Sequence, residues 1–203
     1  MQRFTLRAFA GLVASALACL ACSGVATSDS EASMPPLPDS VGFPPRVELR
    51  ADSVAQFVAY ALGTSEREHI RRELDRARGD EAIAAAMLDA LDRSWTLQER
   101  RHLVRDVSTG SMVLWLMQHL REGAFESRLA VLLEAEVDDA APEAEAVRYL
   151  QSVAAEALAC IPTATARART TELATGHPSV AVRNSAAWQL REQRCDFMLT
   201  GAE

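Results

Sequence analysis

Between Val47 and the C-terminus, apolar residues recur every three or four positions, the spacing that places them on one face of a helix. Ile70 and Leu74 are four positions apart, and Leu129 and Leu133 repeat that interval further along the chain. No stretch alternates apolar and polar residues convincingly enough to indicate a strand. The pattern predicts an all-α domain, with helices near residues 51–62, 66–78, 81–93, 97–108, 111–122, 124–137, 143–160, 164–174 and 179–192.

Two kinds of residue mark the expected helix boundaries. Ser65 and Thr96 are each followed three positions later by a glutamate, Glu68 and Glu99, which is the spacing of a capping box at a helix start. Glycine suits the left-handed position that often ends a helix. Four glycines stand where the expected helices would stop, namely Gly63, Gly79, Gly110 and Gly123.

One of the expected helices is apolar on every side, because residues 112–117 read MVLWLM. A helix that is hydrophobic all round is normally covered by neighbours. We therefore expect helix 111–122 to lie at the centre of the domain, with its methionines and tryptophan in the core rather than around a cofactor.

The N-terminal end of the chain follows a different pattern. Arg3 and Arg7 precede an apolar run from Ala8 to Ala21, and this order is typical of a secretory signal peptide. The run is shorter than the roughly 20 apolar residues that a membrane-spanning helix needs. We therefore assign residues 1–21 to a signal peptide and exclude them from the folded domain.

The residues that follow the apolar run, LACSG at 20–24, resemble the signal of bacterial lipoproteins, in which a cysteine is lipidated and becomes the mature N-terminus. The resemblance implies lipid attachment at Cys22, with Cys19 as the second choice. The alternative is ordinary cleavage after an Ala-x-Ala site, which would release a soluble secreted protein. Residues 22–46 are rich in proline and are expected to form a disordered tether. The expected location is the cell envelope, facing the periplasm.

The clearest motif of the folded part is HPSVAVRNSAAWQL at 177–190, which resembles the second helix of a HEAT repeat. The family pattern is a proline turn, then Val-Arg, then paired alanines and a leucine. The resemblance implies antiparallel helix pairs stacked in a short α-solenoid, with an arginine hydrogen-bonded to a neighbouring turn. The repeat residues in this chain are Pro178, Val182, Arg183, Ala186 and Leu190.

The same resemblance suggests a division of the domain. Residues 164–174 would be the first helix of the repeat, and residues 128–158 resemble a weaker copy. Residues 124–203 are then HEAT-like repeats with a C-terminal cap, and residues 47–123 are a divergent N-terminal helical part. HEAT-like stacks present a broad surface to other proteins. This implies a non-enzymatic scaffold or adaptor for another envelope protein or a peptide, in contact with the membrane only through its lipid.

Composition excludes several classes of function. All 21 basic residues are arginine, so a Schiff-base lysine, a Walker A lysine and a Ser/Lys dyad are impossible. The 28 acidic residues outnumber them and the formal net charge is −7. Binding of nucleic acid needs a clustered basic surface that this balance does not offer.

None of the four histidines lies in a zinc-binding or hydrolase motif, so no metal, cofactor or catalytic residue is assigned. His69 could share a helix face with Glu66 and Glu73, but such a trio is usually solvated. An enzymatic alternative is a small periplasmic hydrolase or lyase. Its site would be built from Glu99, His102 and His119.

Two features near the C-terminus bear on packing and binding. Cys160 and Cys195 stand just beyond helix ends that would meet at one edge of the stack, which in an exported protein predicts a disulfide. Two buried free thiols are the alternative. Trp188 lies off the inner stripe of its helix, so it is either a contact for a partner or a residue that packs against 197–199.

Overall fold

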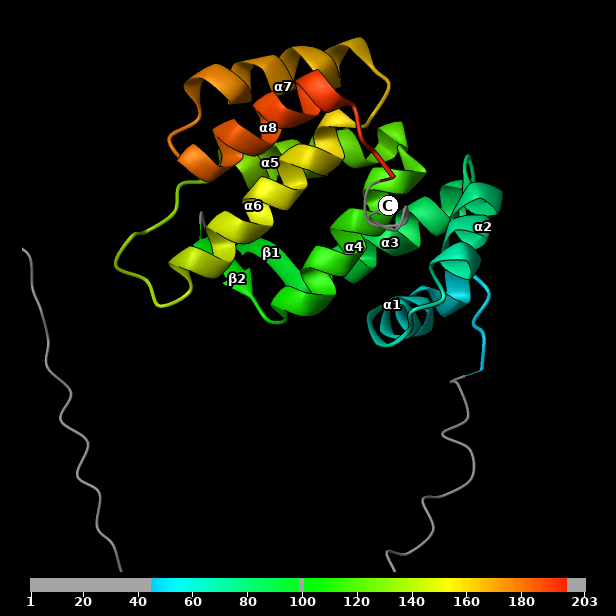
Figure 1. Ribbon diagram of the computed structural model, residues 1–203. Helices are drawn as coiled ribbons and strands as arrows, with labels where there is room; N and C mark the ends of the chain where they lie inside the picture. The colour runs from blue at the N-terminus through cyan, green and yellow to red at the C-terminus, as the bar shows by residue number, and fades with distance from the viewer. Residues whose placement is uncertain (1–44, 99–100, 197–203) are drawn as a thin grey trace, which may run out of the picture. The chain divides into compact units, whose positions relative to one another are not determined.

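Eight α-helices account for most of residues 45–98 and 101–196, the part of the chain that the computed structural model describes (Figure 1). The all-α prediction is confirmed for these residues. The proposed signal peptide, Cys19, Cys22, nearly all of the tether, Glu99 and residues 197–203 lie outside them. The helices are α1 (Val54–Gly63), α2 (Arg67–Ala77), α3 (Glu81–Ser94), α4 (Val107–Leu120), α5 (Glu126–Glu134), α6 (Ala144–Ala159), α7 (Ala164–Gly176) and α8 (Val180–Glu192), with 3-10 turns at Ala51–Ser53 and Gly123–Phe125.

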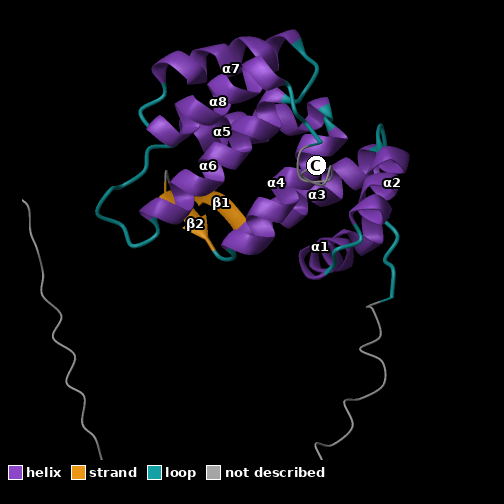
Figure 2. Cartoon of the chain, viewed as in Figure 1, coloured by secondary structure: helices purple, strands orange, loops and turns teal. Residues whose placement is uncertain are grey.

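A β-hairpin stands where a helix over 97–108 was predicted, and that prediction is wrong (Figure 2). Strand β1 (Trp95–Gln98) pairs antiparallel with β2 (Arg101–Val104). Trp95 is completely buried, and the branched and aromatic residues of this stretch favour strands once one face is packed. Thr96 therefore belongs to a strand and does not cap a helix.

The true start of α4 is Asp106, whose carboxylate accepts a hydrogen bond from the Thr109 amide at 3.0 Å. The helix therefore runs through Gly110, which had been expected to stop a helix. A Cβ at Gly110 would lie 3.3 Å from the Ser94 hydroxyl and 3.4 Å from the Leu150 side chain. Glycine here lets α4 approach α3 and α6 closely, and the helix ends instead at Arg121, which is left-handed with φ 61°.

The other predicted boundaries have mixed outcomes. Gly63 ends α1, and Gly79 has the positive φ of 78° expected after α2. Ser65 does not form the expected capping box, because the residue that precedes α2 is Glu66 and its side chain caps nothing. The predicted ranges of the last three helices agree with α6, α7 and α8 to within two residues.

Helix α4 lies at the centre of the core, as its apolar run predicts. Val113, Leu114 and Met117 are completely buried, and the helix packs against α1, α2, α3 and α6. Met112 and Trp115 from the same run are only half-buried. One side of this helix therefore reaches the surface.

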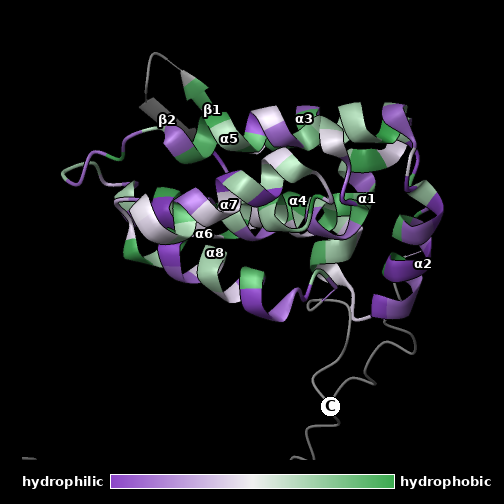
Figure 3. Ribbon diagram, turned by 90° about the horizontal axis from the view of Figure 1, so that it is seen from above, coloured by the Kyte–Doolittle hydropathy of each residue, from purple (hydrophilic) through white to green (hydrophobic). Residues whose placement is uncertain are grey.

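The C-terminal part of the domain is built by close packing of small residues. Helix α6 packs along α8 and α4, while α5 packs on α6 and α7 packs on α8. Seen as in Figure 3, α3 and α5 lie on one side of this part of the chain and α6 and α8 on the other. Both helices carry completely buried alanines, Ala154 and Ala155 in α6 and Ala186 in α8. Alanine allows the two backbones to come close, which suits a continuous helical layer.

No helix among the described residues is both long enough and apolar enough to cross a lipid bilayer.

Candidate functional site

His69 and the two glutamates near it hold the segment that enters the domain. The His69 Nε2 atom is 3.0 Å from the Val47 carbonyl oxygen. Glu73 accepts a hydrogen bond from the Leu49 amide at 2.9 Å. Both contacts attach residues 47–49 to α2, so this trio has a structural role. The described residues contain no group of three or more histidine, cysteine, aspartate or glutamate side chains placed to hold a metal ion.

Glu66 completes this attachment with an unusually acidic carboxyl group. Arg46 donates two hydrogen bonds to it at 3.0 and 3.1 Å, and the Tyr60 hydroxyl donates a third at 2.5 Å. These bonds favour the ionised form and lower the pKa of Glu66 to about 2. The carboxylate is therefore a fixed acceptor at neutral pH and has no role as a proton donor.

His119 is 2% exposed and lies between two carboxylates. Its Nε2 is 3.0 Å from Asp75 Oδ1, and its Nδ1 is 3.0 Å from Asp196 Oδ1. The hydrogen bond from His119 lowers the pKa of Asp75. Arg121 also binds Asp196, at 2.7 Å. This network, in which His119 is buried and both aspartates reach the surface, joins α2, the end of α4 and the segment after α8.

Of the residues of the enzymatic alternative, His102 and His119 lie on different elements. His102 lies in β2, which ends three residues before α4 begins and belongs to a hairpin packed against α3, α5 and α6. His119 lies in the last turn of α4, about 18 Å along the helix axis from its first residue. Both ring nitrogens of His119 face carboxylates, and Glu99 lies outside the described residues.

His177 fastens the turn between α7 and α8 to the end of α5. Its Nδ1 accepts a hydrogen bond from the Ser179 amide at 3.1 Å, and its Nε2 is 2.8 Å from the Leu133 carbonyl oxygen. An atom that accepts from an amide carries no proton, whereas an atom that faces a carbonyl must carry one. The arrangement therefore fits the neutral ring protonated on Nε2.

The residues of the HEAT-like motif divide into a turn and an inner stripe. Arg183 donates to the carbonyl oxygens of His177 and Pro178, the latter at 2.9 Å, so it binds its own turn and not a neighbouring one. Val182 and Ala186 are completely buried. Leu190 is half-buried, and the fully enclosed position beside it belongs to Gln189.

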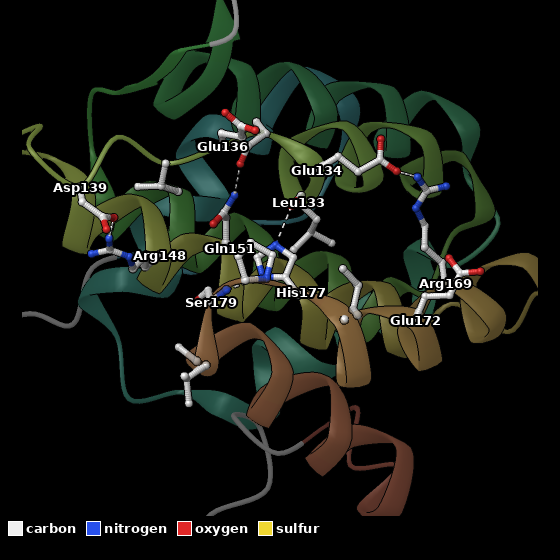
Figure 4. Close-up of a pocket in the computed structure, with 17 residues that line it drawn as sticks. Leu133, Glu134, Glu136, Asp139, Arg148, Gln151, Arg169, Glu172, His177 and Ser179 are labelled. Atoms are coloured by element: carbon white, nitrogen blue, oxygen red, sulfur yellow. Dashed lines mark hydrogen bonds and ion pairs between the residues drawn. The ribbon is translucent and has the colours of Figure 1, made fainter.

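The largest cleft among the described pockets surrounds His177 (Figure 4). It has a volume of about 1010 Å³ and is bounded by the end of α5, the α5–α6 loop, the start of α6, and the end of α7 with the turn that follows. Figure 4 shows the imidazole of His177 in the middle, directed at Leu133. The amide of Gln151 donates to the Leu132 and Ala135 carbonyl oxygens beside it.

The charged groups of this cleft are mostly paired with one another. Arg148 forms an ion pair with Asp139, and Arg169 forms one with Glu134. Both nitrogens of His177 are already hydrogen-bonded. The ring of His177 therefore holds the turn and is not placed as a free base beside the described residues that line the cleft.

A second, smaller depression is lined by other residues of α6, and we call it the aromatic groove. It has a volume of about 210 Å³. All of its described lining residues come from three helices, whereas the larger cleft is lined by both helices and loops. Its lining residues are Trp115 and Gln118 from α4, Tyr149, Ser152, Val153 and Glu156 from α6, and Trp188 from α8.

Glu156 is the only carboxylate among the described residues that line the aromatic groove. The Ser185 hydroxyl donates a hydrogen bond to it at 2.8 Å, and no arginine among the described residues forms an ion pair with it. Burial disfavours its charged form and raises the pKa of Glu156. A half-buried carboxylate beside aromatic rings is therefore left without a neutralising charge.

Trp188 is half-buried and lies in this groove, so it is positioned to touch a ligand. Its possible packing against residues 197–199 falls outside the described part of the chain. Sequence reasoning did not find Trp115, Tyr149 or Glu156. Tyr149, Ser152 and Glu156 have the three- and seven-residue spacings of one helix face, which was the available signal. Their pairing with α4 and α8 had no local signal.

Cys160 and Cys195, which the sequence analysis singled out as a pair, are joined by a disulfide with an S–S distance of 2.08 Å. The bond ties the end of α6 to the segment that follows α8. Arg194 in that segment offers its carbonyl oxygen to the amides of Gln118 and Gln189, each at 3.2 Å. The helices that line the aromatic groove are thus fastened together next to it.

No protein-family model matches this chain, and searches of curated proteins and of solved structures find no match either.

Proposed function

We propose that this protein is an exported, lipid-anchored adaptor of the cell envelope that binds another protein through the aromatic groove. The observation that carries the proposal is that Trp115, Tyr149 and Trp188, from three different helices, line one depression. Tryptophan and tyrosine dominate the binding energy of many protein interfaces. Tyr149 is 43% exposed, although its ring is large and mostly apolar.

The order of helix packing supports a HEAT-like stack. Helices α3, α5 and α7 each pack against the helix that follows, and α4, α6 and α8 pack successively on one another. That is the arrangement expected of three helix pairs whose second helices form one layer. The aromatic groove lies on this layer, where a stacked-repeat protein would present a surface to its partner.

The enzymatic alternative has no support from the described geometry. Of the histidines it needs, His102 lies in β2 and His119 in the last turn of α4, and the larger cleft uses its histidine to hold a turn. A binding function requires only an accessible surface with suitable chemistry. The aromatic groove meets that requirement, because Tyr149 is exposed and Trp115 and Trp188 are half-buried.

Site-specific photo-crosslinking tests the binding function. A benzoylphenylalanine at Tyr149 should capture one defined envelope protein in living cells. The same reagent at Val131, which is 47% exposed on α5 and outside the groove, is the matched control. We expect the captured protein to be absent from the control and reduced by Trp188→Leu. Equal capture at both positions, or no capture at Tyr149, would contradict the proposal.

The lipid anchor needs a separate measurement, because it concerns residues outside the described structure. Mass spectrometry of the N-terminal peptide from the native membrane fraction should find a diacylglycerol group on Cys22, or else on Cys19. An unmodified N-terminus beyond Cys22 would show that the protein is secreted in soluble form and would remove the membrane from the proposal.

A further inference from the structure

The aromatic groove combines two features that together select the charge of a ligand. Trp115, Tyr149 and Trp188 supply aromatic rings, whose faces attract cations. Glu156 supplies a carboxylate, and no basic side chain is found among the described residues that line the depression. The charged group of this lining is Glu156, so an anionic ligand would be repelled, whereas a cation would be attracted both by the carboxylate and by the faces of the aromatic rings.

Hydrogen-bonding capacity in the groove is mainly that of an acceptor. The Ser152 hydroxyl donates its proton to the Tyr149 carbonyl at 2.7 Å, which leaves the oxygen as an acceptor. The Gln118 amide nitrogen donates to the Arg194 carbonyl, which leaves its amide oxygen as an acceptor. Glu156 receives one hydrogen bond from Ser185 and has further acceptor positions. A ligand with several N–H donors suits these three groups.

The size of the groove limits what can enter. Its volume of about 210 Å³ is below the roughly 300–1,000 Å³ of typical small-molecule pockets. One long side chain can occupy it, whereas a folded segment or a cofactor cannot. A quaternary ammonium head group would fit by size but has no N–H to donate to the acceptors.

From these observations we infer that the aromatic groove binds an arginine or lysine side chain of the partner protein, held between the rings of Trp115, Tyr149 and Trp188 and the carboxylate of Glu156. This inference rests on the proposed adaptor function and names the chemistry of the contact. The net charge of −7 also favours a partner with a basic surface, since opposite charges accelerate association.

Binding of a cation should change the protonation of the groove. Burial raises the pKa of Glu156 in the free protein, and a cation in contact with it would lower that pKa again. The ligand therefore prefers the ionised carboxylate. Affinity should increase as pH rises through the raised pKa of Glu156 and then become constant.

Peptide titration of the full chain tests the inference directly. The probes are acetylated pentapeptides Ala-Ala-X-Ala-Ala-amide, in which X is arginine, lysine, citrulline or norleucine. Tryptophan fluorescence reports binding, because Trp115 and Trp188 line the groove while Trp95 is fully buried. Citrulline has the shape of arginine without its charge. We expect the arginine peptide to bind at least about fivefold more tightly than the citrulline peptide.

Two variants carry the control. Glu156→Gln keeps the shape and the hydrogen bond to Ser185 and should reduce affinity for the arginine peptide about fivefold to tenfold. Glu136→Gln removes the same charge in the larger cleft and should leave affinity unchanged. Circular dichroism melting checks that both variants are folded.

Carbodiimide coupling provides a second readout that does not depend on fluorescence. The reagent condenses a carboxyl group with an amine to form an amide, and is itself converted to a urea by the water removed. The chain has no lysine, so no side-chain amine of the protein competes with the lysine peptide. Peptide mapping should find the adduct enriched on Glu156 over the exposed carboxylate of Glu172.

Several results would overturn the inference. Equal affinity for arginine and citrulline peptides, no saturable signal with any peptide, or an unaltered affinity in Glu156→Gln would each do so. Binding to phosphatidylcholine vesicles without binding to the arginine peptide would assign the groove to a lipid head group instead. If photo-crosslinking at Tyr149 captures a partner that Glu156→Gln still binds fully, the adaptor function stands and only the cationic contact fails.

Discussion

The two cavities of this domain differ in how their polar groups are used. The cleft around His177 is about five times larger than the aromatic groove, at about 1010 against about 210 Å³. Its histidine and most of its charged side chains are bound to other parts of the protein. The groove has one carboxylate and several acceptors directed to no cation. A site is suited to bind a ligand when its polar groups can still form hydrogen bonds or ion pairs, whatever its volume. Polar groups that are already bound to one another hold neighbouring helices together instead.

The largest effect on the free energy of unfolding is expected for loss of the Cys160–Cys195 disulfide. Replacing both Cys160 and Cys195 by alanine should lower the free energy of unfolding by about 4 kcal/mol, because the bond closes a loop with a sequence separation of 35. Urea denaturation under identical conditions measures this. Wild type treated with a reductant should behave like the double variant, and an unchanged midpoint in both would show that the bond contributes nothing to stability.

The larger cleft should respond to mutation through stability. His177→Ala removes the hydrogen bonds to the Ser179 amide and the Leu133 carbonyl and should cost about 2 kcal/mol. The side-chain oxygen of asparagine can accept a hydrogen bond from the amide two residues later. His177→Asn can therefore restore the bond to Ser179 and should recover part of the lost stability. Thermal melting compares the two variants. A destabilised His177→Ala that still captures the partner would support a purely structural role, whereas lost capture at full stability would place the ligand in the cleft.

The groove should show the opposite behaviour, with a small effect on stability and a pH dependence of definite sign. Since the pKa of Glu156 is raised in the folded protein, folding binds protons between the unfolded and folded pKa values. Its ionisation therefore lowers stability as pH increases through that interval. Glu156→Gln should be slightly more stable than wild type at pH 7 and should lose this advantage below the pKa of the unfolded chain.

Melting temperatures measured from pH 3 to pH 8 test this sign. Glu66 supplies the internal contrast, because Arg46 and Tyr60 hold its pKa at about 2. The ionised Glu66 side chain therefore stabilises the folded protein at every pH above the ordinary glutamate pKa, and this stabilisation is lost as the pH falls toward 2. Glu66→Gln should consequently lower the melting temperature at pH 7. If both variants shift in the same direction at neutral pH, the account of Glu156 is wrong.

The smallest effect is expected at the mouth of the larger cleft. Glu136→Gln and Glu172→Gln change exposed carboxylates that make no side-chain ion pair among the described residues. Each should alter the free energy of unfolding by less than about 0.5 kcal/mol and leave partner capture intact. If either variant clearly lost the ability to capture the partner protein, the larger cleft and not the aromatic groove would be the binding site.

Sequence pattern alone was sufficient for the helices whose faces have regular apolar spacing. The ranges expected for α6, α7 and α8 agree with the structure, and the apolar run at 112–117 correctly indicated a central helix. Arg183 also binds a turn, as its motif implies, although the turn is its own. These features depend on residues close together in the chain, so the relevant information is local.

The hairpin at 95–104 shows where local information fails. Thr96 and Glu99 have the spacing of a helix start, yet burial of Trp95 against α3 and α5 places this stretch in strands. A weak local preference is easily outweighed by the free energy of burying a tryptophan. The prediction that a helix ends at Gly110 is wrong for a similar reason. Glycine at this position has no side chain, which leaves room for the side chains of Ser94 and Leu150 to pack closely against α4.

By itself the sequence determined the helical class, most helix ranges, the exclusion of lysine chemistry and the two cysteines that stand at neighbouring helix ends. Only the tertiary structure decided that Trp115, Tyr149 and Trp188 share a groove with Glu156. Helix periodicity is set by hydrogen bonds four residues apart, so it can be recognised in a short window. A groove is formed by side chains from helices distant in the chain, and their meeting depends on how closely α4, α6 and α8 pack.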